Sequence, residues 1–163
     1  MTYAGVGSRK APQDMLDMGC NIGYQLALLN YILQSGGASG MDKYFELGCN
    51  KAQGKKNIFY ARDATSEAIT MARTLLGDRH WNNMGQYAQM LHARNCFQVL
   101  GKDLNTPVKF LICWAEPDLG TYGGLTPKGG TRTAWRLAME YDIPCYNLYS
   151  DLDRCKVMDI IHP

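Results

Sequence analysis

Short apolar segments alternate with amphipathic helical segments along almost the whole chain. Strand-like runs occupy residues 2–6, 31–34, 58–61, 108–114 and 145–148, and apolar residues recur at helical spacing between them and after the last one. Adjacent parallel strands need a crossover connection, usually a helix. The alternation therefore predicts an α/β fold, with a mainly parallel sheet and helices on both faces as three layers.

Length and composition restrict the class of protein further. The 163 residues suit one domain spanning 1–163 rather than two large ones, and a net charge of +2 does not indicate a general nucleic-acid binder. No apolar run approaches the roughly 20 residues that cross a bilayer. The six cysteines contain no Cys-x-x-Cys pair, so we expect free thiols, no metal site and a cytoplasmic protein without a membrane partner.

Three donor-rich loops, at residues 7–10, 36–40 and 128–131, each lead toward a predicted helix. Glycine lets a backbone approach a ligand closely, and a helix terminus offers amide donors and partial positive charge. Ligands of open parallel sheets collect at the carboxyl edge, where the strand order reverses. Although glycine before a helix is also ordinary turn chemistry, three such loops together predict a phosphate-binding site comprising Gly7, Ser8, Arg9, Gly36, Gly37, Ser39, Gly40, Gly129, Gly130, Thr131 and Thr133.

Known nucleotide fingerprints are incomplete in these loops. No P-loop is present, and the Gly5-Val6-Gly7 segment lacks the third glycine of the dinucleotide fingerprint. The incomplete fingerprints argue against ATP hydrolysis and hydride transfer as functions, and we expect no cofactor.

Arg94 places a charge on the apolar face of a predicted helix over residues 86–100. It lies four residues after Met90 and three before Phe97, hence on their side. A guanidinium in that position needs an anionic or carbonyl partner, so Arg94 is either paired internally or directed at a ligand phosphate or carboxylate. Asn95 is expected to hydrogen-bond a loop or a sugar hydroxyl.

Two carboxylates are candidates for chemistry if the protein is an enzyme. Asp42 either stabilises its helix terminus or accepts hydrogen bonds from a ribose or a neighbouring loop. Glu116, after the most continuous strand, is either a loop acid in water or a catalytic or ribose-binding group.

The aromatic residues divide into core and candidate stacking groups. Tyr3, Trp114 and Trp135 are candidates to stack on a base, but the core is the favoured expectation for aromatic residues in such a sheet. Tyr122, in a polar glycine-rich loop, is the best candidate for stacking. That loop, residues 116–130, is long enough to act as a lid. The pair Lys55-Lys56 is interpreted as a solvated turn.

Four motifs, in order, resemble the SLOG superfamily, which joins the DNA processing protein A family, the Lonely Guy phosphoribohydrolases and related nucleotide-sensing domains. Residues 5–9, Gly-Val-Gly-Ser-Arg, resemble its first-strand Val-Gly-Ser-Arg, and residues 36–42 resemble its Gly-Leu-Ala-Arg-Gly-Ile-Asp turn. Arg94-Asn95 matches an Arg-Asn pair, and residues 129–134, with Glu140, are similar to a Ser-Gly-Ser-x-x-Thr-Ala helix start. The resemblance implies a single Rossmann-like nucleotide-binding domain.

The resemblance also ranks the functions. Ser39 stands in place of an arginine of the DNA processing family, and Trp135 stands where Lonely Guy enzymes carry a catalytic glutamate. The leading hypothesis is therefore a sensor or sequestering protein for a phosphorylated nucleotide or nucleotide-derived signal. The first alternative is a nucleoside 5'-monophosphate phosphoribohydrolase that uses Glu116 or Asp42.

Two further expectations concern macromolecular partners. The second alternative function is a recombination mediator that binds single-stranded DNA, with phosphate contacts from Arg9, Lys10, Lys128 and Arg132. Self-association as a homo-oligomer is expected through outer apolar side chains such as Trp135 and Met139.

Overall fold

One sheet organises the chain, whose computed structural model describes residues 1–120 and 124–163. Its five strands have the order β3-β2-β1-β4-β5, and every neighbouring pair is parallel. The strands are β1 (Thr2–Gly7), β2 (Ile32–Ser35), β3 (Lys56–Ile58), β4 (Leu111–Trp114) and β5 (Cys145–Asn147). The α/β class and the parallel sheet predicted from the alternation are thereby confirmed.

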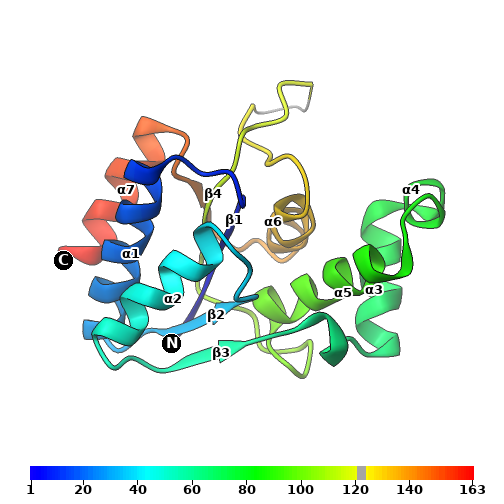
Figure 1. Ribbon diagram of the computed structural model, residues 1–163, viewed down its shortest axis with the longest axis horizontal. Helices are drawn as coiled ribbons and strands as arrows, with labels where there is room; N and C mark the ends of the chain where they lie inside the picture. Colours follow the sequence, from blue (N-terminus) through cyan, green and yellow to red (C-terminus); the bar gives the residue numbers. More distant parts are fainter. Residues whose placement is uncertain (121–123) are drawn as a thin grey trace.

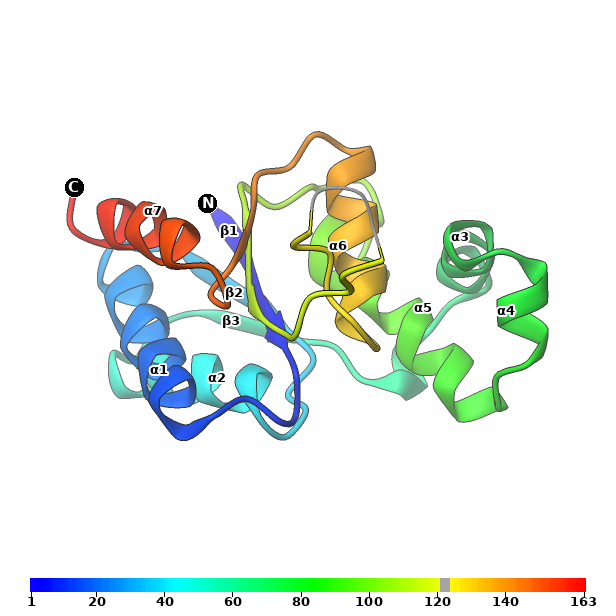
Figure 2. The same ribbon diagram turned by 90° about the horizontal axis from the view of Figure 1, so that it is seen from above.

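Helices cover both faces of the sheet, as Figures 1 and 2 show. Helices α1, α2 and α7 pack on one face, and α3, α5 and α6 pack on the other. The described helices are α1 (Gln13–Leu28), α2 (Met41–Lys51), α3 (Ser66–Leu76), α4 (Asp78–Asn82), α5 (Gln86–Leu100), α6 (Thr131–Glu140) and α7 (Asp151–Ile161), with a 3-10 turn at Ala61–Asp63. The sheet and the helices on its two faces form the three layers of a Rossmann-like arrangement.

The strand periodicity produces the two cores. On β1, Tyr3 faces the α1–α2–α7 core, whereas Ala4 and Val6 face the α3–α5–α6 core. All four residues of β4 are buried, because this strand is covered on both faces.

Helices α1 and α2 cross very closely. A side chain at Gly23 would overlap the backbone of Phe45, and one at Gly48 would overlap the carbonyl of Cys20. These two glycines therefore set the distance at which α2, which carries Asp42, lies against α1.

Several local expectations are corrected by the structure. The third strand is Lys56–Ile58 rather than 58–61, and Lys56 is not in a solvated turn, because its Nζ lies 2.6 Å from Glu46 Oε1. The segment before the helix predicted over residues 86–100 contains the short helix α4, whose Trp81 is buried in the core.

The expected oligomer surface is also corrected in part. Trp135 is only 5% exposed and belongs to the core, so it contributes no outer apolar face. Met139 is 58% exposed, as expected. All six cysteines are free thiols. Within residues 1–120 and 124–163, no helix has both the length and the apolar character to cross a membrane.

Candidate functional site

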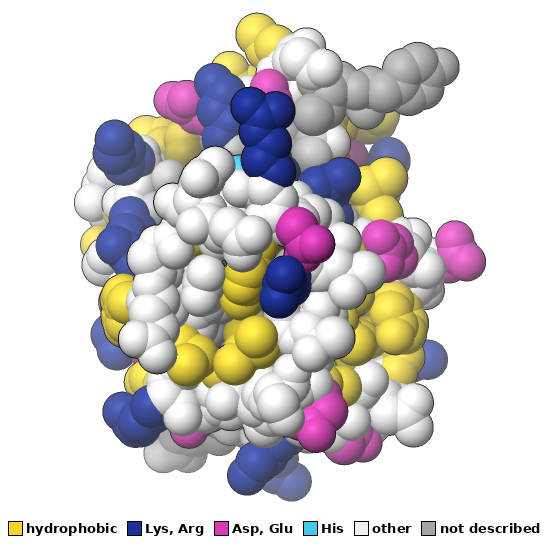
Figure 3. All heavy atoms as spheres, turned by 90° about the vertical axis from the view of Figure 1, so that its right-hand side faces the viewer, with side chains coloured by type: hydrophobic (Ala, Val, Ile, Leu, Met, Phe, Trp, Pro, Cys, Tyr) yellow, Lys and Arg dark blue, Asp and Glu magenta, His cyan; other side chains and the backbone are white. Residues whose placement is uncertain are grey.

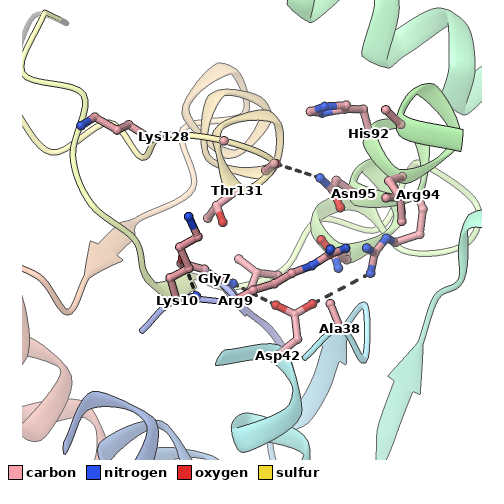
Figure 4. Close-up of a pocket in the computed structure, with 17 residues that line it drawn as sticks. Gly7, Arg9, Lys10, Ala38, Asp42, His92, Arg94, Asn95, Lys128 and Thr131 are labelled. Atoms are coloured by element: carbon pink, nitrogen blue, oxygen red, sulfur yellow. Dashed lines mark hydrogen bonds and ion pairs between the residues drawn. The ribbon is translucent and has the colours of Figure 1, made fainter. Parts of the chain in front are cut away.

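A cavity of about 390 Å³ opens at the carboxyl edge of the sheet. From β1 the chain runs to β2 and β3 on one side, and then to β4 and β5 on the other, so the strand order reverses between β1 and β4. This reversal leaves a crevice where the loops diverge. The cavity, shown in Figure 4, is lined by Val6, Gly7, Ser8, Arg9, Lys10, Ala38, Asp42, Ala88, Leu91, His92, Arg94, Asn95, Gln98, Lys128, Gly129, Gly130 and Thr131.

The structure thus brings residues from all three predicted loops to one cavity. The predicted site residues that line it are Gly7, Ser8, Arg9, Asp42, Arg94, Asn95, Gly129, Gly130 and Thr131. Those outside its lining are Gly36, Gly37, Ser39, Gly40, Glu116 and Thr133. From the second loop, Ala38 lines the cavity, and Asp42 follows it in the first turn of α2.

Asp42 ties the first two loops together. It is 4% exposed, and its Oδ1 accepts a hydrogen bond from the Gly7 amide at 2.9 Å. Its Oδ2 accepts from the Gly36 amide at 3.1 Å and lies 3.9 Å from Arg94 Nη1. One of the roles expected for Asp42 was to accept hydrogen bonds from a neighbouring loop, and the structure shows this role.

Burial raises the pKa of Asp42 from 3.8 to about 6, although Arg94 and the loop amides favour its ionised form. Because the folded-state pKa is raised, protonation of Asp42 stabilises the fold fully below pH 3.8, and this contribution is lost as the pH rises through about 6.

A pH titration of stability checks this shift. We expect the free energy of unfolding of the wild type, relative to that of Asp42→Asn, to rise by about 3 kcal/mol as the pH falls from 7.5 to 3.5. Urea unfolding at several pH values measures the difference, and comparison with the non-titrating variant removes the contribution of other acids. A difference that stays constant with pH would contradict the raised pKa.

Arg94 is paired internally, which is one of the two arrangements expected for it. It is 6% exposed, and its Nη1 donates to the Phe59 carbonyl at 3.4 Å in addition to facing Asp42. Its Nε is buried without a partner among the described residues. A side chain at Gly36 would occupy the place of this guanidinium, so Gly36 is required for its position.

Helix α5 connects the second and third loops. Asn95 Nδ2 donates to the Gly130 carbonyl at 2.9 Å. Asn95 was expected to hydrogen-bond either a loop or a sugar hydroxyl, and the structure shows the bond to a loop. The hydrogen-bond network orients the Gln98 amide so that its oxygen accepts from Arg94 Nη1 at 3.1 Å and from the Gly36 amide at 2.8 Å. Its nitrogen then donates to Asn95 Oδ1 at 3.2 Å. One polar network therefore runs from α2 through α5 to the start of α6.

The charges around the cavity are mostly positive. Among the described residues that line it are four cations, Arg9, Lys10, Arg94 and Lys128, and one acid, Asp42. Figure 4 shows the side chain of Arg9 extending toward Arg94, and burial together with the charge of Arg9 lowers the pKa of Arg94, while Asp42 raises it. In Figure 3, Lys and Arg side chains also gather at the top of the molecule, beside the loop after β4. The cavity is thus suited to an anion.

Two charged residues proposed for function make other contacts. Glu116 has a 68% exposed side chain that faces Lys128 at 3.9 Å. Arg132 pairs with Asp118 and donates from Nε to the Pro127 carbonyl at 3.2 Å. Arg132 therefore holds the loop after β4 in place of facing the cavity.

The sequence reasoning missed His92 and Gln98. His92 Nδ1 lies 2.6 Å from Thr133 Oγ1, and burial, with the charges of His80 and Arg94, lowers the pKa of His92. A signal was available, since residues 88, 91, 92, 95 and 98 share one face of a helix by their spacing.

The expected core aromatics are confirmed, because Tyr3, Trp114 and Trp135 are all nearly fully buried. Tyr122, the expected stacking residue, lies outside the described residues, as does part of the segment interpreted as a lid. The described parts of that segment pair with each other, through the Asp118 amide and the Thr126 carbonyl at 2.7 Å.

The fold and the cavity together define the class of protein: a parallel α/β domain with a cationic cavity at its topological switch point. No protein-family model matches the chain, and no curated protein or solved structure matches it. Among residues 1–120 and 124–163, no group of three or more His, Cys, Asp or Glu side chains is arranged to hold a metal ion.

Proposed function

We propose that this protein is a SLOG-type domain that binds a phosphorylated nucleotide, or a signalling molecule derived from one, as a sensor or sequestering protein. The observation that supports the proposal is the charge of the cavity: four cations and one buried acid line about 390 Å³ at the switch point. An anionic ligand relieves the repulsion between Arg9 and Arg94, whose guanidinium groups act on each other.

The phosphate is assigned to the deep half of the cavity. Arg94 Nε is buried without a partner among the described residues, and Arg9 and Lys10 are exposed on the first loop. Guanidinium groups bind phosphate through paired hydrogen bonds, and the start of α6 adds backbone donors at Gly130 and Thr131. Asp42, Gln98 and Asn95 hold these donors in place without needing to touch the ligand.

Binding measurements with a charge variant test the proposal. We expect purine or pyrimidine nucleoside monophosphates to bind the wild type, and Arg9→Gln to weaken that binding about tenfold or more, because a charge-assisted hydrogen bond is lost. Isothermal titration calorimetry at low salt, preceded by a thermal-shift screen, measures both. The matched control is Arg136→Gln, which removes the same charge from an exposed position outside the cavity.

Two outcomes would overturn the proposal: no nucleotide raises the melting temperature of the wild type, or Arg9→Gln and Arg136→Gln bind equally well. Release of free base during the same incubations, lost in Asp42→Asn, would instead favour the phosphoribohydrolase alternative, because Asp42 is the carboxylate that lines the cavity.

A further inference from the structure

One face of α5 continues beyond the cavity. Leu91, Arg94 and Gln98 line the cavity, and their spacing places them on one stripe of the helix. Tyr87 lies four residues before Leu91 and seven before Arg94, so it extends the same stripe outward by one turn.

The polarity of this stripe changes along its length. Arg94 and Gln98, at its deep end, are buried and polar, whereas Ala88 and Leu91 add apolar lining nearer the start of α5. Tyr87 is 69% exposed, more than any other described aromatic residue among the exposed large hydrophobic side chains. Tyr87 is not among the residues that line the cavity, but it lies one helical turn outward from Leu91, which does. An exposed ring at this place, beyond an apolar lining and a cationic cavity, fits a ligand with a flat ring at one end and a negative charge at the other.

We infer that Tyr87 is a stacking platform for the base of the nucleotide, with the phosphate held at Arg9 and Arg94. This inference rests on the nucleotide-binding function proposed above and adds a residue that selects ligands carrying an aromatic base. Tyr87 and Arg94 are separated by about 10 Å along the helix axis, a span comparable to that between the phosphate and base of a mononucleotide. Stacking on an aromatic side chain tolerates any base, because every base has a π-face.

The experiment compares a nucleotide with a ligand that lacks the base. Affinities for adenosine 5'-monophosphate and ribose 5-phosphate are measured by calorimetry for the wild type, Tyr87→Ala and Tyr87→Phe. We expect Tyr87→Ala to weaken nucleotide binding about tenfold and to leave ribose 5-phosphate binding unchanged, while Tyr87→Phe keeps the wild-type affinity. The matched control is Tyr141→Ala, which removes an aromatic ring that is 46% exposed at the opposite end of α6 from the cavity.

The remaining outcomes separate this inference from the function on which it rests. If both ligands bind, but Tyr87→Ala binds the nucleotide as the wild type does or loses both ligands equally, the stacking role is overturned and anion binding stands. If neither ligand binds the wild type, the proposed function fails and this inference fails with it. Because Tyr87 is largely exposed, its replacement leaves the core intact, which circular dichroism of the variant verifies.

Discussion

Asp42→Ala is expected to lower the free energy of unfolding by about 3–5 kcal/mol at pH 7, and the melting temperature by roughly 10 °C or more. The substitution leaves the Gly7 amide without its acceptor, removes one of the two acceptors of the Gly36 amide and leaves Arg94 without its carboxylate. Each buried donor that loses its partner retains the cost of its desolvation. The loss is therefore large, even though burial makes ionised Asp42 itself unfavourable.

The matched control for this prediction is Asp14→Ala. Asp14 is the second residue of α1, as Asp42 is the second residue of α2, but Asp14 is exposed. Both substitutions remove an acid from the first turn of a helix, and only one removes the link between loops. Urea unfolding followed by circular dichroism measures both variants. Equal losses would show that Asp42 acts only on the helix terminus.

Gly48→Ala is expected to destabilise the fold by about 3 kcal/mol, although alanine favours an isolated helix by about 1 kcal/mol over glycine. The added methyl group would overlap the Cys20 carbonyl and lie 2.7 Å from the Tyr24 amide nitrogen. Both are backbone atoms of α1, so no rotamer change relieves the overlap and the two helices must separate. Thermal unfolding measures the effect.

Gly85→Ala is the control for this second prediction. Gly85 has a φ of −66°, which alanine adopts freely, and a side chain there would meet no atom within 4 Å. We expect the free energy of unfolding of Gly85→Ala to stay within about 1 kcal/mol of the wild type. Alanine stabilises the fold by lowering the entropy of the unfolded chain and destabilises it by being a weaker N-cap than glycine. A loss at Gly85 as large as the loss at Gly48 would mean that close helix packing is not the cause.

The sequence placed residues at the sheet-edge cavity where turn-forming residues between neighbouring elements decide their position. Glycine and small polar residues between a strand and a helix predict a loop at the sheet edge, and Ser8, Gly129 and Gly130 do line the cavity. The sequence did not indicate the direction of the Thr133 side chain, which lies outside the cavity lining. This residue faces His92 because it lies on the inner side of α6.

The sequence alone determined the class of fold and the edge at which the loops collect, because hydrophobic periodicity and turn residues act over a few neighbouring positions. Only the tertiary structure decided which strand lies beside which, since that depends on contacts between distant segments. It also decided that Asp42 accepts hydrogen bonds both from Gly7, 35 positions away in the chain, and from Gly36, six positions away. The free energy of such a buried hydrogen bond depends on the desolvation of both partners. The residues next to each partner in the sequence do not indicate how far it is desolvated.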